Sequence, residues 1–118
     1  MGVGMPQQIL LHQFGKLIFD AFGEWPYHVG SSVFDKAGWR DVDVRVMLDD
    51  AEYERVVGGP PVNPPLNNKR WCALCLAFSI VGREMTGLPI DFQIQQTTEA
   101  NRLYGDKPRS ALILCAEF

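Results

Sequence analysis

The sequence predicts an α+β domain in which a small mixed β-sheet is backed by helices. Two observations carry this prediction. Two kinds of segment are mixed along the chain. In one kind apolar residues recur at helical spacing, and in the other apolar and polar residues alternate as in strands. The length of 118 residues suits one compact domain with one hydrophobic core. We therefore expect residues 1–118 to form a single domain.

The composition narrows the class of protein. Hydrophobic residues make up 47% and charged residues 21%, which argues against general disorder and against collagen-like structure. A formal charge of −3 makes a strongly basic nucleic-acid-binding face unexpected. Three cysteines do not form a secreted disulfide framework and indicate a reducing, cytoplasmic compartment. The longest apolar run, 71–82, is shorter than the ~20 residues of a membrane-spanning helix, so no membrane partner is expected.

The first part of the chain predicts a helix and a short strand. Apolar residues recur at helical spacing over 7–22, with Pro6 before them and Gly23 after them. The β-prone segment 27–29 then runs into Gly-Ser-Ser at 30–32. This sequence is typical of a tight turn that opens a short helix.

The segment 41–48 alternates with period two, which predicts a strand. Its apolar face consists of Val42, Val44, Val46 and Leu48. Its polar face carries Asp41, Asp43 and Arg45. A short helix through residue 57 is expected after the capping pair at 49–50, and the Gly- and Pro-rich segment 58–65 is expected to be a loop.

The last part of the chain repeats this pattern. Residues 68–86 predict a long helix that stops at Gly87. Residues 88–95 alternate again, with Asp91 on the polar face of this second strand. A helix capped by Thr-Thr-Glu is expected over 97–104, and the apolar tail 110–118 suits either a strand or a helix.

Three acidic residues suggest a metal site. Asp41 and Asp43 share one face of one strand, with their Cα atoms ~6–7 Å apart. If the strand that carries Asp91 is a neighbour, three carboxylates crowd together, which is unfavourable without cations. Hard divalent ions with oxygen ligands relieve this repulsion, so we expect Mg²⁺, or Mn²⁺ in its place. Phosphoryl and nucleotidyl transfer use such sites.

The order of these motifs resembles a known family. The sequence His28–Ser31, nine further residues and then Asp41–Val44 resembles the signature of the DNA polymerase β-like nucleotidyltransferase superfamily. That signature begins with an apolar residue, a Gly and then a second Gly or a Ser. After roughly ten residues it continues with Asp-x-Asp or Asp-x-Glu between apolar residues. A third acid on a later strand matches Asp91, and the chain is most similar to minimal members that consist of the catalytic core alone. One departure is Arg40, which stands where the family often has Ser or Thr.

The resemblance implies a metal-dependent enzyme that moves a nucleoside monophosphate from a nucleoside triphosphate to an acceptor hydroxyl and releases pyrophosphate. It makes Asp41, Asp43 and Asp91 the metal ligands and the catalytic residues, with Asp91 also the base toward the acceptor. The acceptor is a protein, an RNA end or a small molecule, and nucleic acid is expected only in that role. A minimal core further suggests a protein partner or self-association.

The same resemblance implies a phosphate-binding turn. Gly30, Ser31 and Ser32 would hold the β and γ phosphates at the start of the following helix. Arg45 lies on the same strand face as the acids, where it either neutralises a phosphate or pairs with Asp43.

Two other readings of the sequence stay open. The chain could keep the fold as a catalytically inactive module that binds a nucleotide or a partner. Alternatively, Asp-x-Asp could be only the polar face of a strand in a structural interaction protein. Cys72 and Cys75 lie in an apolar helical run without a second cysteine pair, which favours packing over a zinc site.

Overall fold

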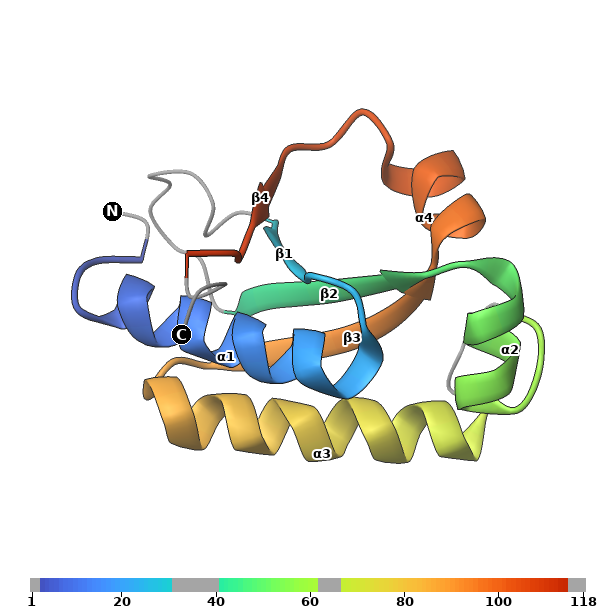
Figure 1. The fold of residues 1–118 in the computed structure, drawn as a ribbon, viewed down its shortest axis with the longest axis horizontal. Helices are drawn as coiled ribbons and strands as arrows, with labels where there is room; N and C mark the ends of the chain where they lie inside the picture. The colour runs from blue at the N-terminus through green and yellow to red at the C-terminus, as the bar shows by residue number, and fades with distance from the viewer. Residues whose placement is uncertain (1–2, 31–40, 62–66, 115–118) are drawn as a thin grey trace.

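The computed structural model describes residues 3–30, 41–61 and 67–114. In chain order its elements are α1 (Gln7–Phe22), β1 (Tyr27–Val29), β2 (Val42–Leu48), α2 (Asp50–Val57), α3 (Lys69–Thr86), β3 (Ile90–Gln96), α4 (Thr97–Tyr104) and β4 (Arg109–Ala111) (Figure 1). The short helix predicted after the Gly-Ser-Ser turn lies outside the described residues. None of the described helices is long and apolar enough to cross a membrane.

The described strands form one mixed sheet in the order β3-β2-β1-β4. β2 and β3 run parallel, whereas β1 runs antiparallel to both β2 and β4. The predicted α+β class with a mixed sheet packed against helices is therefore confirmed. α1 and α3 cover one face of the sheet, while α4 and the chain that leads to β4 rise above the other face (Figure 1). This second, less covered face is where the acidic residues lie.

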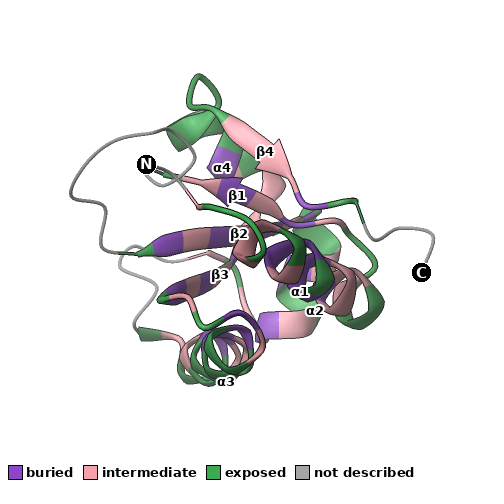
Figure 2. Ribbon diagram, turned by 90° about the vertical axis from the view of Figure 1, so that its left-hand side faces the viewer, coloured by how far each residue is buried: buried purple, intermediate pink, exposed green. Residues whose placement is uncertain are grey.

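The core lies between the sheet and the pair α1 and α3. The predicted apolar positions of β2 are all buried, and the polar positions between them are only partly buried. This alternation is visible along the strands in Figure 2. Phe92 of β3 packs against three phenylalanine rings at centroid distances of 5.5–6.2 Å: Phe14 and Phe22 of α1 and Phe78 of α3. The apolar face of each strand thus points toward the helices and the polar face away from them.

Local capping explains where the helices begin and end. The side chains of Asp49 and Asn68 accept hydrogen bonds from backbone N–H groups in the first turns of α2 and α3. The cap predicted for α4 is wrong, because Gln96 occupies that position without a side-chain hydrogen bond. The Thr97 hydroxyl instead donates to the carbonyl oxygen of Leu48, which ties the start of α4 to the end of β2.

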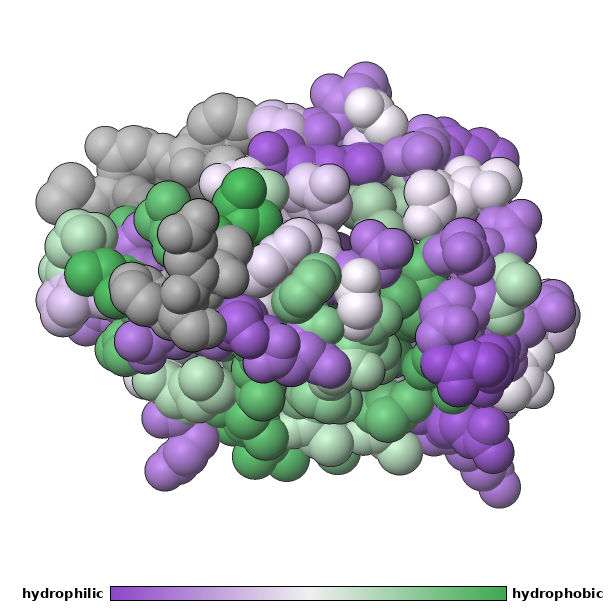
Figure 3. Space-filling view, viewed as in Figure 1, coloured by the Kyte–Doolittle hydropathy of each residue, from purple (hydrophilic) through white to green (hydrophobic). Residues whose placement is uncertain are grey.

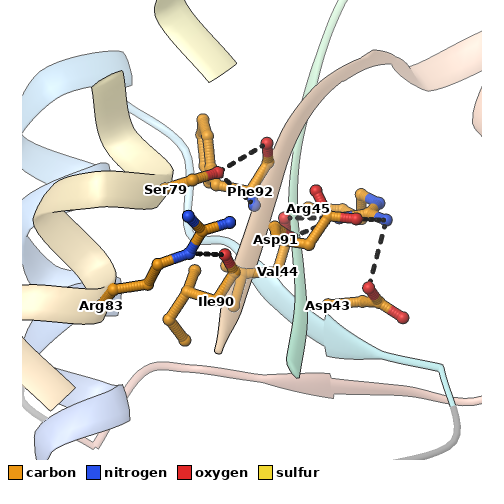
Figure 4. Close-up of polar contacts among 8 residues, drawn as sticks. All are labelled: Asp43, Val44, Arg45, Ser79, Arg83, Ile90, Asp91 and Phe92. Atoms are coloured by element: carbon orange, nitrogen blue, oxygen red, sulfur yellow. Dashed lines mark hydrogen bonds and ion pairs between the residues drawn. The ribbon is translucent and has the colours of Figure 1, made fainter. Parts of the chain in front are cut away.

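Side chains of α3 satisfy the outer edge of β3, which is an edge strand of the sheet (Figure 4). The contributing residues are Trp71, Ser79 and Arg83. The Ser79 hydroxyl accepts from the N–H of Phe92 at 2.9 Å. The Trp71 Nε1 and Arg83 Nε groups donate to the carbonyl oxygens of Ile94 and Ile90 at 2.8 and 3.0 Å. An edge strand with satisfied polar groups offers no template for pairing with another strand.

Replacing Ser79 by Ala is expected to lower the free energy of unfolding by about 1–3 kcal/mol, because the buried N–H of Phe92 loses its acceptor. Urea denaturation followed by circular dichroism measures the change. Ala21→Ser, which adds a hydroxyl at an exposed position of α1, serves as the control and should shift stability by less than about 0.5 kcal/mol. Equal stability of Ser79→Ala and the wild type would show that the Ser79 contact is not needed.

Candidate functional site

The parallel pairing of β2 and β3 brings the predicted acids together. Asp43 is aligned with Asp91 in the register of these two strands. Both side chains lie on the face opposite the core, because their neighbours along each strand point toward the helices. One carboxylate oxygen from each of Asp41, Asp43 and Asp91 lies within 4.8 Å of the other two. The strands that carry Asp43 and Asp91 are therefore neighbours, as the predicted metal site required.

Arg45 lies between two of these carboxylates (Figure 4). Its Nη2 atom is 3.5 Å from a carboxylate oxygen of Asp43 and 3.5 Å from one of Asp91. Its Nη1 atom donates to the backbone carbonyl oxygens of Asp91 and Val44 at 2.6 and 3.1 Å. Because the Arg45 side chain is only 12% exposed, these contacts hold the guanidinium in place. Of the two roles expected for Arg45, pairing with Asp43 is present, and the phosphate role stays a prediction.

The cluster has more acidic than basic groups, because only one guanidinium, that of Arg45, accompanies three carboxyl groups. Burial raises the pKa of Asp43, and the neighbouring Asp91 and Asp41 raise it further, while Arg45 acts in the opposite direction. A raised carboxyl pKa means that the ionised form is disfavoured at its position. A divalent cation would relieve this cost, and carboxylate oxygens are the ligands that Mg²⁺ prefers. The donor set and its spacing therefore suit a hard metal ion whose identity is open.

Gly30 borders the acidic cluster. It follows β1 with a φ of +81°, in the left-handed region that glycine adopts without strain. A Cβ atom at this position would overlap an oxygen of the Asp43 carboxylate. Glycine is thus required here both by the backbone angle and by the closeness of Asp43. Ser31 and Ser32, the other predicted phosphate-binding residues, lie outside the described residues.

Replacing Gly30 by Ala is expected to destabilise the fold and to weaken metal binding, because the new methyl group would push the Asp43 carboxylate aside. The cost of the left-handed backbone alone is about 1–2 kcal/mol. Thermal unfolding with and without Mn²⁺ or Mg²⁺ measures both effects.

Gly23→Ala is the matched control, since Gly23 has a φ of +79° and no atom near its Cβ position. It should lose similar stability through backbone strain and keep full metal binding. If both variants bind the metal ion like the wild type, the closeness of Gly30 to Asp43 has no role in the site.

A cleft of about 540 Å³ lies over the acidic face of the sheet. Its lining comes from β1, β2 and β3 on one side and from the segment between α4 and β4 on the other: Val29, Gly30, Asp43, Arg45, Met47, Gln93, Gln95, Tyr104, Lys107, Pro108 and Arg109. This volume lies in the range of small-molecule sites. A smaller hollow of about 210 Å³ shares Gln93, Gln95 and Tyr104 with the cleft and extends toward Trp71 and Glu99.

The sequence reasoning missed the second wall of this cleft. Tyr104, Lys107 and Arg109 line it, and none of them was predicted to belong to a site. Arg109 reaches the site because β4 pairs with β1, which sets Arg109 opposite Val29, the residue before Gly30. The signal that could have identified this wall is the pair of basic residues on either side of Pro108, the second of which, Arg109, begins β4.

Cys72, Cys75 and His28, the histidine next to the glycine turn, do not join the acidic cluster. Cys75 is buried in the core, and burial raises its pKa to about 12, so it is not a reactive thiolate. Cys72 packs against the same core, as the packing interpretation expected. His28 is buried on β1, and burial lowers its pKa to about 4, which keeps the ring neutral near pH 7.

Comparison with known proteins finds no matching family model, no matching curated protein and no matching solved structure. What the chain offers is an α+β fold with one parallel strand pair, a cluster of three aspartates and a cleft beside it.

Proposed function

We propose that this chain is a Mg²⁺-dependent nucleotidyltransferase similar to the minimal members of the DNA polymerase β-like superfamily. It would transfer a nucleoside monophosphate from a nucleoside triphosphate to an acceptor hydroxyl and release pyrophosphate. The observation that carries this proposal is the convergence of Asp91 on β3, Asp43 on β2 and Asp41, the residue before β2, beside Gly30. This arrangement supports the resemblance that the linear motif suggests.

The three carboxylates would hold the metal ions. When bound there, Mg²⁺ neutralises charge on the transferred phosphoryl group and favours ionisation of the acceptor hydroxyl. The acceptor oxygen attacks the α-phosphorus, and the bond from that phosphorus to the leaving pyrophosphate oxygen breaks. Asp91 accepts the proton of the acceptor hydroxyl. The rate then depends mainly on positioning and on charge neutralisation.

The cleft beside the carboxylates accommodates the nucleotide. Gly30 allows the backbone to approach the phosphates closely, since it carries no Cβ. Lys107 and Arg109 on the opposite wall supply positive charge for the β and γ phosphates. Tyr104, which also lines the cleft, offers a ring on which the base can stack. These residues act by binding and orienting, and the carboxylates lie at the reacting centre.

One observation favours a second function. Arg45 already provides a cation between Asp43 and Asp91, which is where a catalytic site would place a metal ion. A chain that uses Arg45 for charge balance could keep the nucleotide cleft without turnover, as a module that binds a nucleotide or a partner. The two functions differ in whether binding is followed by transfer.

Mg²⁺ together with a nucleoside triphosphate is expected to raise the thermal stability of the protein. At a ligand concentration of 100 Kd the stabilisation is about 2.7 kcal/mol, which corresponds to a Tm increase of several degrees. Each of the four ribonucleoside triphosphates is tested with Mg²⁺, with EDTA in place of Mg²⁺ as the control. No shift with any nucleotide would overturn the enzyme and the nucleotide-binding module alike, and would leave only a module that binds a partner.

The transfer step is tested with each α-labelled nucleoside triphosphate and Mg²⁺ in cell extract. Label that appears on a macromolecule or a small metabolite supports the enzyme and identifies its acceptor class. A thermal shift without labelled product in any extract supports the inactive module instead. Lys107→Ala should weaken nucleotide binding without changing metal binding, because Lys107 is proposed to contact the phosphates and not the metal ions.

A further inference from the structure

An apolar stripe follows the outer face of α3. Leu76 and Ile80 are 58% and 54% exposed, although they are large aliphatic side chains on a long helix. Ala73 and Ala77 are exposed on the same face. In Figure 3 hydrophobic surface runs along α3 with hydrophilic surface at its two ends. Positions 69, 73, 76 and 80 recur with the four-three spacing by which one helix packs against another.

The charges at the two ends of this stripe oppose the dipole of α3. Lys69 is the first residue of α3, where the helix carries a partial positive charge, and no acidic residue lies in the first turn. Glu84 lies in the last turn, where the partial charge is negative. Within the described part of the chain neither Lys69 nor Glu84 forms an ion pair. Neither charge is thus paired within the described residues, although Arg83 adds a positive charge to the last turn.

We propose that the stripe on α3 binds the same stripe of a second copy of this chain, with the two helices antiparallel. An antiparallel partner brings its C-terminal end to the N-terminal end of α3. It thereby sets Glu84 of the partner subunit beside Lys69, and Lys69 of the partner subunit beside Glu84. Both unfavourable end charges are then paired across the interface, which a parallel pair would not achieve.

The apolar residues complement each other in the same register. When Lys69 is opposite Glu84 of the partner subunit, the small Ala73 is opposite Ile80 of the partner subunit. Leu76 is then opposite Ala77 of the partner subunit. Each large side chain meets a small one, which lets two helices approach closely without collisions or gaps. The two-fold axis passes between residues 76 and 77, so the two halves of the interface are equivalent.

The interface is independent of the proposed nucleotidyl transfer. α3 covers one face of the sheet (Figure 1), and the cleft lies over the other, so pairing leaves the cleft of each chain open. One helix face on each side makes a contact at the low end of the range for specific interfaces. We therefore expect a dimer with a dissociation constant in the micromolar range, on the order of 10–100 µM.

Analytical ultracentrifugation of the purified chain at about 5–500 µM tests the pairing. The wild type is expected to pass from monomer to dimer over this range. Leu76→Lys should remain monomeric at every concentration, with an unchanged circular dichroism spectrum. Leu103→Lys, the same kind of change at an exposed leucine of α4, is the control and should dimerise like the wild type. A wild type that stays monomeric, or a Leu76→Lys variant that still dimerises, overturns the proposal.

Charge reversal tests the orientation. Lys69→Glu and Glu84→Lys should each weaken dimerisation by about tenfold, because like charges then meet at both ends of the interface. Each single variant should at the same time unfold at a slightly higher temperature as a monomer, because its new charge suits the helix dipole. The double variant should dimerise within about threefold of the wild type, since the pairs are restored with opposite sign. A double variant that is no better than the singles excludes the antiparallel arrangement.

Discussion

Replacing Asp43 by Asn is expected to abolish nucleotidyl transfer and to leave the fold at least as stable as the wild type. The loss of transfer follows because a carboxylate ligand is removed from the cluster, and a decrease of at least 10²–10³-fold in rate is the order of magnitude for a lost stabilising group at a reacting centre. Stability should not suffer because burial raises the pKa of Asp43, so its ionised form is unfavourable in the folded protein. The amide has nearly the same shape and no charge.

The pH dependence of stability tests whether the ionised Asp43 carboxylate is the unfavourable group. The pKa of Asp43 is higher in the folded than in the unfolded chain, so stability is gained as the pH falls through the raised value. The wild type should therefore approach the stability of Asp43→Asn on acidification, and its Mg²⁺ affinity should fall over the same range because protons compete for the carboxylate.

Urea denaturation across pH and Mg²⁺ titration of both proteins give these curves. Asp20→Asn, which removes an exposed acid on α1 far from the cluster, is the control and should behave as the wild type in transfer. If Asp43→Asn unfolds, the carboxylate is needed for folding. If the variant keeps nucleotidyl transfer, Asp43 is not a required metal ligand.

The largest loss of stability is expected for Phe92→Ala. The Phe92 ring is fully buried on β3 and contacts rings from both α1 and α3, so it joins the sheet to both helices that cover it. Removing it leaves a cavity at the centre of the core, at a cost of about 3–5 kcal/mol. This is a large share of the roughly 5–15 kcal/mol that stabilise a domain, and it should lower the Tm by roughly 10–20 °C.

Phe19→Ala is the matched control for this prediction. The Phe19 ring is only partly buried and stacks on Trp25 at a centroid distance of 4.1 Å, away from the sheet. Its loss should cost clearly less than that of Phe92, about 1–2 kcal/mol. Calorimetry of both variants measures the difference. Equal losses would mean that the aromatic cluster around Phe92 is not the centre of the core.

The helices and strands could be predicted because their signals are local. The alternation of β2 sets every second side chain on one face whatever its neighbours are, and Gly23 and Gly87 end helices through their own backbone freedom. The bounds of α4 agree with the prediction, but its cap was predicted incorrectly, for the opposite reason. The Thr97 hydroxyl bonds to Leu48 of β2, a contact between residues far apart in the sequence, instead of capping its own helix.

The candidate site divides in the same way. The two-residue spacing of Asp41 and Asp43 was enough to predict that they lie together, although β2 begins only at Val42 and Asp41 precedes it. The alignment of Asp91 with Asp43 depends on which strands are neighbours and in which register. The position of Arg45 between these two carboxylates depends on the same strand pairing. The wall of Lys107 and Arg109 depends on β4 returning to pair with β1.

By itself the sequence determined which segments are helical or extended, which side of each strand is apolar, and that three acids were available on polar strand faces. Only the tertiary structure decided that those acids meet, that an arginine already partly balances them, and that a basic wall faces them across a cleft. The physical reason is that periodicity and capping are properties of neighbouring residues. Strand pairing and register are instead chosen by the burial of the whole core, to which residues distant along the chain contribute together.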